Sequence, residues 1–464
     1  APAALTLERL HRAGFVEQLP LYHPDTVTVP GACAAWCDLV ARFGKLPLSD
    51  VLAPAIRLAE EGFPVSPVTA HFWQNHAENR LSRTPGGLEL TLEGRAPQPG
   101  EIFRNPGLGR ALRSVAQGGA PAFYQGEIAA AIASAVRAAG GCLSEADLAA
   151  HRSTWEQPVH TPYHSLRIWE CPPNGQGIAV LLALNILEGF DLSGMEPLSA
   201  ARLHLEIEAM RLAFADTRWY AADPAFNPAP LEALLSKEYA AEQRKRIDPR
   251  QANPDLRRGR PLPGSNTVYL SVVDGAGNAC SFINSIYSEF GSGIVPPGWG
   301  FSLHNRGHSF SLDPAHPNAL APGKRPYHTI IPSLATVAQP GGPGSQAVFE
   351  PLYACFGVMG AFMQPQGQLQ VVTAMQDDGA DPQAALDLPR FCILDGVPNG
   401  AVALEQGISP KVMAELAEMG HSVLPTQGYD RAIFGRGQII RRGLVDGVLC
   451  GGSDPRADGC AMTI

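Results

Sequence analysis

Long apolar stretches are absent from this sequence. The longest aliphatic run near its centre covers residues 178–184, far fewer than the roughly 20 residues that a membrane-spanning helix needs. A basic surplus is missing too, because 44 Asp and Glu outweigh 35 Lys and Arg and the net charge is -9. This balance argues against a protein that binds nucleic acid or an acidic membrane surface.

Cysteine pairs of the zinc or redox type are also lacking. The nine cysteines are an odd number, lie scattered along the chain and form no CxxC pair. Most have apolar neighbours in the sequence, so we predict buried free thiols and a reducing, cytoplasmic location. No internal repeat or low-complexity block accompanies the 48 Gly and 42 Pro, which indicates turns rather than a fibrous or disordered chain.

The overall composition is that of a globular protein. The spacing of its apolar residues changes near residue 250. Hydrophobic residues make up 45% of the 464 residues and charged residues 17%. Before residue 250, apolar residues recur at helical spacing, and Ser144 with Asp147 is typical of a helix-capping pair. The predicted helices cover residues 31–43, 49–61, 108–116, 127–139 and 198–220.

The second half favours strands. Residues 267–273 alternate in polarity, 274–277 form a turn, and 278–285 are extended again, which predicts a β-hairpin. Hairpins rather than βαβ units favour antiparallel sheets layered with helices. Further strands are predicted at 161–169, 330–338, 346–349, 369–374, 401–404 and 444–449, and helices at 382–388 and 410–419.

A loop leads directly into the predicted hairpin. Residues 249–266 are rich in Pro, Gly and Arg and have almost nothing to bury, so we predict an exposed, mobile loop. If the bond between Asn266 and Thr267 is cut, Thr267 gains a free amine that can act as base for its own hydroxyl. One threonine at a strand start is by itself ordinary.

The wider sequence resembles the γ-glutamyltransferase (glutathione hydrolase) family of N-terminal-nucleophile (Ntn) hydrolases. The similarity extends over the whole chain, in order. The stretches that carry it are residues 51–59, 207–216, 266–278, 290–295, 317–326 and 452–456.

The resemblance implies a fold, a cleavage and a set of residues. The expected fold is α+β, an αββα sandwich of two stacked antiparallel sheets flanked by helices. A precursor would cut itself before Thr267 into a large segment, 1–266, and a small segment, 267–464, that share one interleaved fold. Ser285 would bind the new amine, and Tyr287 would line the substrate. Gly360 and Ala361 would form the oxyanion hole, where Ala361 is acceptable only with a negative φ.

The same resemblance implies a heterodimer of the two segments, alone or as a dimer of heterodimers, with no metal and no organic cofactor. It also implies a carboxylate-binding arginine just before the Ala-Pro with which the sequence starts, so we expect an upstream segment that carries it.

Departures from the family pattern point to the substrate. Ser309 stands where the family has an acidic residue for the substrate ammonium, and a hydroxyl cannot supply that charge. His328 and Thr329 replace paired serines, and Arg306 replaces a glutamine. We therefore expect an amidohydrolase for a small carboxylate-bearing amide without an ammonium group, such as oxamate, an intermediate of purine catabolism.

Four alternatives remain. Arg306 can equally form a structural ion pair with Asp313 or Asp274. The protein can be a γ-glutamyl hydrolase or transpeptidase acting on glutathione-type substrates, or a non-catalytic relative. His304 and His308 have the i, i+4 spacing of a metal site, but Gly307 disfavours the helix and Arg306 would repel a cation.

Overall fold

The computed structural model describes residues 1–254, 256, 267–338 and 350–464. These residues form two compact units. The first comprises Ala1–Trp155 and Ile286–Pro326, and the second comprises Glu156–Ser285 and Tyr327–Ile464. Each unit takes residues from both sides of the 266–267 bond, and each has its own core. No helix formed by the described residues is both long and apolar enough to cross a membrane.

Helices dominate the first unit. On α6, Ile128, Ile132 and Val136 are fully buried at four-residue spacing, which is the apolar stripe of an amphipathic helix. The predicted capping pair is confirmed, because Ser144 and Asp147 form a reciprocal capping box at the start of α7. The elements are α1 (Leu7–Arg12), α2 (Ala32–Phe43), α3 (Leu48–Glu61), β1 (Phe63–Pro64), α4 (Pro67–Ala77), β2 (Ile102–Phe103), α5 (Pro106–Tyr124), α6 (Glu127–Ala138), α7 (Glu145–Ala149) and the 3-10 helices η1 (Pro24–Thr26), η2 (Leu81–Arg83), η3 (Gly87–Leu90) and η4 (Arg306–Ser309).

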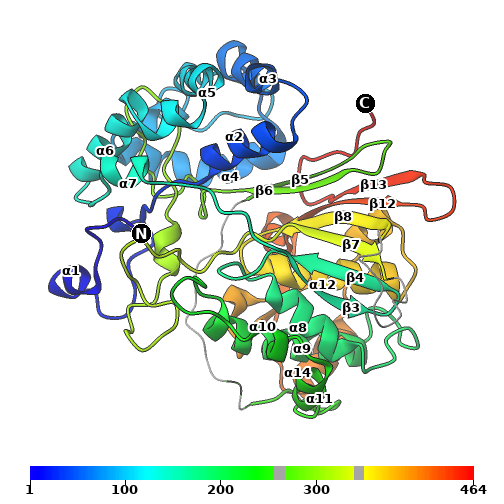
Figure 1. Cartoon of the computed structure of the whole chain (residues 1–464). Helices are drawn as coiled ribbons and strands as arrows, with labels where there is room; N and C mark the ends of the chain where they lie inside the picture. Colours follow the sequence, from blue (N-terminus) through cyan, green and yellow to red (C-terminus); the bar gives the residue numbers. More distant parts are fainter. Residues whose placement is uncertain (255, 257–266, 339–349) are drawn as a thin grey trace, which may run out of the picture. The chain divides into compact units, whose positions relative to one another are not determined.

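A six-stranded antiparallel sheet is the centre of the second unit. Its strand order is β13-β12-β8-β7-β4-β3. Helices α8 and α12 lie against one face of this sheet, and α9 packs on α8 (Figure 1). The strands are β3 (Val159–Tyr163), β4 (Leu166–Glu170), β7 (Ser333–Val337), β8 (Leu352–Met359), β12 (Arg436–Arg442) and β13 (Leu449–Ser453), and the helices are α8 (Ile178–Leu187), α9 (Ala200–Tyr220), α10 (Leu231–Leu234), α11 (Lys237–Arg244) and α12 (Met363–Gln376).

The predicted hairpin forms a second layer on the opposite face of this sheet. It consists of β5 (Val268–Val273) and β6 (Ala279–Asn284). On β8, a Cβ at Gly357 would lie 2.5 Å from the ring of Tyr269 on β5, whereas the next side chain, Val358, lies against Gly367 of α12. Because neighbouring strand residues face opposite sides, the hairpin and α12 cover opposite faces of β8. The α+β prediction of stacked antiparallel sheets with flanking helices is confirmed.

A third, three-stranded sheet completes the second unit. Its order is β11-β10-β9, and the β10–β11 pair is parallel. Predicted helices at 382–388 and 410–419 are confirmed as α13 and α14. The elements are α13 (Pro382–Asp387), β9 (Phe391–Ile393), η5 (Leu394–Gly396), β10 (Val402–Glu405), α14 (Pro410–Glu418), β11 (Val423–Thr426) and η6 (Gly428–Phe434).

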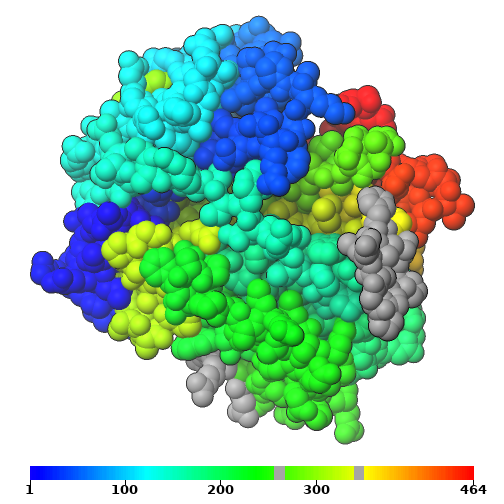
Figure 2. Space-filling view, viewed as in Figure 1, coloured from blue at the N-terminus to red at the C-terminus, as the bar shows by residue number. Residues whose placement is uncertain are grey.

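Two predicted strands are wrong. Residues 369–374 belong to the buried helix α12. Residues 444–448 form the turn between β12 and β13, where Val445 is fully exposed, and this hairpin reaches the surface in the space-filling view (Figure 2, orange-red). The central strands β8 and β12 were not predicted at all. The predicted strand at 346–349 lies outside the described residues.

Two burial predictions also need correction. Four thiols are exposed, those of Cys171, Cys280, Cys450 and Cys460. The loop that precedes Thr267 is not devoid of buried residues, because Leu256 is 2% exposed and accepts a hydrogen bond at its carbonyl from Asn399. Residues 255 and 257–266, including Asn266, lie outside the described residues.

Candidate active site

Thr267 and Ser285 lie opposite each other at one end of the β5–β6 hairpin. Thr267 directly precedes β5, and Ser285 directly follows β6. The antiparallel register pairs Val268 with Asn284, so the next pair outward is Thr267 with Ser285. Directly opposed residues on one face have Cβ atoms about 4.5–5.5 Å apart. The hairpin therefore brings the two hydroxyl side chains together.

The Thr267 side chain faces the layer between the two sheets. Side chains at every second position share a face, and Thr267 and Tyr269 are 6% and 7% exposed, whereas Val268 is 67% exposed. The Oγ1 atom of Thr267 is buried and has no hydrogen-bond partner among the described residues. A buried hydroxyl without a partner costs free energy, typically 1–3 kcal/mol, and such an uncommitted group is available for chemistry.

The stacking of the sheets places Thr267 near the end of β8. The Ser271 hydroxyl donates to the Cys355 carbonyl at 3.2 Å, and the Tyr269 ring lies against Gly357. Moving from Ser271 back to Tyr269 on β5 thus moves the contact on β8 forward by two residues. By the same register, Thr267, two residues before Tyr269, faces Met359, which is the last residue of β8. Gly360 follows immediately.

The turn after β8 has a backbone conformation that most residues avoid. Gly360 has a φ of 132° and Ala361 a φ of 52°. The expectation of a negative φ at Ala361 is therefore wrong, and a left-handed alanine costs about 1–2 kcal/mol. Their carbonyls accept from the amides of Met363 and Gln364, whereas the amides of Gly360 and Ala361 have no acceptor among the described residues. Two adjacent amides are thus left available ahead of α12.

His328 and Thr329 lie beside this turn because one buried residue ties them to it. The His328 amide donates to the Asn174 carbonyl at 2.9 Å, and the His328 carbonyl accepts from the Gln176 amide at 3.0 Å. The Gln176 Nε2 group donates to the carbonyls of Thr329 and Ala361, both at 2.8 Å. Gln176 was not among the residues predicted from the sequence, where its only signal is the turn-like Pro-Pro-Asn-Gly stretch of residues 172–175.

Tyr287, Arg306 and Ser309 form a cluster in the first unit. The Arg306 guanidinium lies over the Tyr287 ring, with Cζ 4.6 Å from the ring centroid. Arg306 is 3% exposed, and burial lowers the pKa of its guanidinium to about 10, against the opposing influence of Tyr287. This arginine is thus a buried cation at neutral pH. The Ser309 Oγ is buried and has no hydrogen-bond partner among the described residues.

The neighbouring histidines are neutral. Burial, with the Arg306 charge second, lowers the pKa of His304 to about 3, and burial also lowers the pKa of His308. The His304 Nδ1 accepts from the Arg306 amide at 3.0 Å, and the His308 ring contacts Gln18 and the Leu19 carbonyl. No cluster of three or more metal-binding side chains exists among the described residues.

The structure thus places the predicted residues in two groups. Thr267, Ser285, Gly360, Ala361 and the His328–Thr329 pair belong to the second unit, and the Tyr287 cluster belongs to the first.

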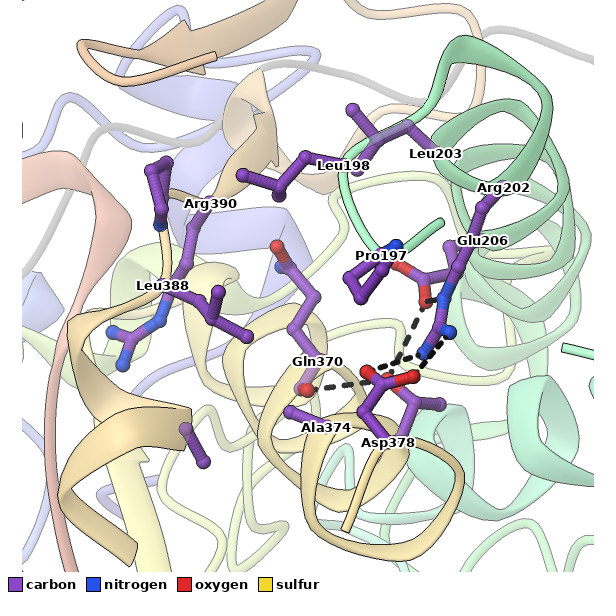
Figure 3. A pocket seen from close by; sticks show the side chains of 13 residues that line it. Pro197, Leu198, Arg202, Leu203, Glu206, Gln370, Ala374, Asp378, Leu388 and Arg390 are labelled. Carbon is purple, nitrogen blue, oxygen red and sulfur yellow. Dashed lines mark hydrogen bonds and ion pairs between the residues drawn. The ribbon is translucent and has the colours of Figure 1, made fainter. Parts of the chain in front are cut away.

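A small pocket in the second unit contains none of the predicted residues. Arg202 of α9 closes it with a bidentate contact to Asp378, at 2.6 and 3.0 Å, and a bond to Glu206 at 3.1 Å (Figure 3). Burial raises the pKa of Glu206 to about 7, although Arg202 opposes this shift. The charged side chains that line this pocket therefore pair with one another, which is typical of a structural ion-pair cluster rather than of a ligand site.

Known proteins match this chain from end to end. The family model described as gamma-glutamyltranspeptidase matches residues 1–464. A crystal structure of cephalosporin acylase from Bacillus halodurans has 42% identity and a TM-score of 0.86, covering 99% of this chain and 82% of that chain.

Two curated relatives are similarly extensive. The glutathione hydrolase-like YwrD proenzyme of Bacillus subtilis is 37% identical over 96% of this chain and 82% of its own length. The oxamate amidohydrolase proenzyme of Klebsiella pneumoniae is 35% identical over 99% and 85%. The chain belongs to the gamma-glutamyltranspeptidase family and is an amidohydrolase of the Ntn type.

Proposed function

We propose that the chain cleaves itself before Thr267 and then hydrolyses a small carboxylate-bearing amide such as oxamate, with Thr267 as nucleophile. The observation that carries the proposal is the buried, unpartnered Thr267 hydroxyl opposite Ser285 and beside two available amides. The two segments, 1–266 and 267–464, remain associated as a heterodimer. The names of both curated relatives include the word proenzyme, which supports such processing.

The reaction follows from the roles of these groups. The free amine of Thr267 accepts the hydroxyl proton as Oγ1 attacks the amide carbonyl, and Ser285 orients that amine. The amides of Gly360 and Ala361 stabilise the oxyanion. The C–N bond breaks and ammonia leaves with a proton, and then water hydrolyses the ester on Thr267. For oxamate the sum is oxamate and water giving oxalate and ammonium.

The substrate class is inferred from charge. Arg306 is a buried cation, and a guanidinium binds a carboxylate through charge-assisted hydrogen bonds, so it would attract the carboxylate of a substrate. Ser309 offers a neutral hydroxyl where a substrate ammonium would need an anion. His328 and Thr329 lie next to the oxyanion turn and would contact the acyl group. A γ-glutamyl substrate carries an ammonium group and fits these residues less well.

An amide panel tests the substrate. We expect the purified, cleaved protein to release ammonia from oxamate and to leave γ-glutamyl p-nitroanilide and glutaryl p-nitroanilide uncut. Turnover of the γ-glutamyl compound without turnover of oxamate would contradict the proposed substrate and favour a γ-glutamyl hydrolase. A Thr267→Ala variant is the control for contaminating amidases.

A further inference from the structure

One buried side chain connects three parts of the candidate active site. Gln176 is fully buried and lies two residues before α8. Its Nε2 group donates to Thr329 and Ala361, and its Oε1 accepts from the Tyr327 hydroxyl at 3.0 Å. Two carbonyls can only accept, so this orientation of the amide is required by its partners. Every hydrogen-bonding atom of the side chain is thus in use.

The bond to Ala361 acts on a strained residue. Ala361 has a φ of 52°, and a strained conformation persists only when its surroundings hold it in place. On its far side the turn is also held, because Gln366 donates to the Phe362 carbonyl at 2.9 Å and the Arg218 guanidinium lies 4.1 Å from the Phe362 ring centroid. Gln176 is the side chain that holds the carbonyl of Ala361 itself.

We propose that Gln176 is a positioning residue of the amidase reaction: it fixes Ala361 in its left-handed conformation and thereby aims the Gly360 and Ala361 amides at the reacting carbonyl. The assignment rests on the proposed function, in which these amides form the oxyanion hole. An oxyanion hole contributes only when its donors are fixed before the reaction. Asn would be one methylene too short to reach both carbonyls, and an ionised Glu would repel them.

The first test replaces the amide with an apolar side chain of similar size. In a crystal structure of Gln176→Met, we expect Ala361 to leave the left-handed region. With the panel amide that the unmutated enzyme hydrolyses, we expect kcat to fall about 10- to 100-fold and KM to change less than about threefold, because the oxyanion forms only during the reaction. Gln176→Glu, which keeps the shape of the side chain, is the second variant if the methionine variant does not fold.

A second substitution separates positioning from general stability. Glycine adopts a positive φ without strain, so Ala361→Gly in the Gln176→Met background should recover a large part of kcat. Asn185→Leu is the matched control, because Asn185 on α8 is equally buried and donates to the Leu235 carbonyl at 3.0 Å. We expect it to lower the thermal midpoint and leave kcat unchanged, and Ala361→Gly should not improve it.

The outcomes are distinguishable. An Ala361 that keeps its φ near 52° in Gln176→Met, with kcat unchanged, would overturn the positioning role and leave the proposed function standing. An Ala361 that moves while kcat is unchanged would contradict both the positioning role and the oxyanion assignment. If no panel amide is hydrolysed, the proposed substrate class fails, and the crystal structure still decides whether Gln176 holds the turn.

Discussion

The chemistry proposed for this protein depends on single residues whose local structure is energetically unfavourable. Thr267 has a buried hydroxyl without a partner, and Ala361 has a backbone conformation that alanine avoids. Unpartnered buried polar groups and strained backbone conformations are concentrated at functional sites. Thr267 was identified from the sequence because it follows an unusual loop within a chain that resembles the Ntn-hydrolase family. The strain at Ala361 was not predicted, because the sequence does not reveal that Gln176 holds the turn.

The strain at Ala361 predicts a gain in stability. Ala361→Gly should raise the free energy of unfolding by about 0.5–1 kcal/mol, because relief of the left-handed conformation exceeds the entropy cost of glycine. Gly360→Ala should lower it by about 1–2 kcal/mol, because a φ of 132° disfavours any side chain. Thermal unfolding of both variants measures the difference. A loss of stability in Ala361→Gly would contradict the strain.

The buried cation at Arg306 predicts a specific binding defect. Arg306→Met should raise KM for carboxylate-bearing amides about 10- to 100-fold, since a charge-assisted contact is lost. Arg110→Met is the control, because Arg110 lies over the Trp299 ring at the same 4.6 Å and is not a predicted site residue. Steady-state kinetics on both variants checks this prediction. Equal KM values for Arg306→Met and the unmutated enzyme would exclude Arg306 from carboxylate binding.

At the scale of elements, the hairpin and the amphipathic helices could be predicted because each follows a simple period. Helix α12 could not. Residues 369–374 include the β-branched run Val-Val-Thr, which favours a strand. In the structure, however, Gln366 and Gln370 of this helix donate to the carbonyls of Ile393 and Phe391 and accept from their amides. The two glutamine side chains on α12 thus satisfy hydrogen-bonding groups at the edge of β9. Strand β8 was missed because six of its eight residues in succession are buried, and such a run has no alternation.

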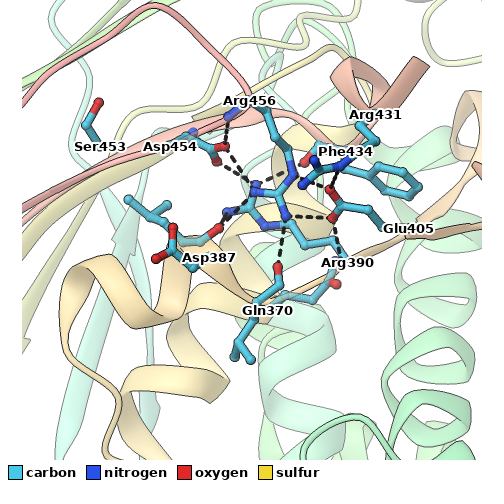
Figure 4. A network of polar contacts seen from close by, with 12 residues as sticks. Gln370, Asp387, Arg390, Glu405, Arg431, Phe434, Ser453, Asp454 and Arg456 are labelled. Carbon is cyan, nitrogen blue, oxygen red and sulfur yellow. Dashed lines mark hydrogen bonds and ion pairs between the residues drawn. The ribbon is translucent and has the colours of Figure 1, made fainter. Parts of the chain in front are cut away.

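The family-like stretch of residues 452–456 is also explained at this scale. Asp454 and Arg456, which follow β13, form a buried ion-pair network with Arg390 and Glu405 (Figure 4). The Arg390–Asp454 and Arg456–Glu405 contacts measure 2.8 and 2.6 Å. This part of the family-like sequence therefore joins β13 to β9 and β10.

This network predicts a strong effect on folding. Asp454→Asn should lower the free energy of unfolding by about 3–5 kcal/mol, because it leaves buried guanidinium charges without their partner. Glu60→Gln in the exposed Arg113–Glu60 pair is the control and should change stability little. Urea unfolding of both variants tests the prediction. Equal losses of unfolding free energy in Asp454→Asn and Glu60→Gln would contradict a structural role for the network.

The same carboxylate predicts a pH dependence. Burial raises the pKa of Asp454, but the charges of Arg390 and Arg456 outweigh it and the net shift is downward. A lowered folded-state pKa contributes stability above the unfolded value of about 3.9, and that stability is lost as the pH falls below it. Unfolding free energies between pH 3 and 7 should therefore decline less steeply at the acid end for Asp454→Asn. Parallel curves would exclude Asp454 as the titrating group.

At the scale of the whole molecule, the decisive feature is the position of one peptide bond. Both compact units contain residues from before and after the 266–267 bond. A cut there would leave each unit built from two chains, so the segments should stay together after cleavage. The sequence predicted this bond from the loop and the family resemblance. It could not predict the division into units, because that depends on contacts between residues far apart in the chain.

The most direct test of the account is the mass of the purified protein under denaturing conditions. We predict two polypeptides, residues 1–266 and 267–464, with Thr267 as the first residue of the second, and a single intact chain for Thr267→Ala. The two polypeptides should elute together under native conditions. An unmutated protein that stays intact and still hydrolyses its amide, or a Thr267→Ala variant that is cleaved at the same bond, would contradict Thr267 as the self-released nucleophile.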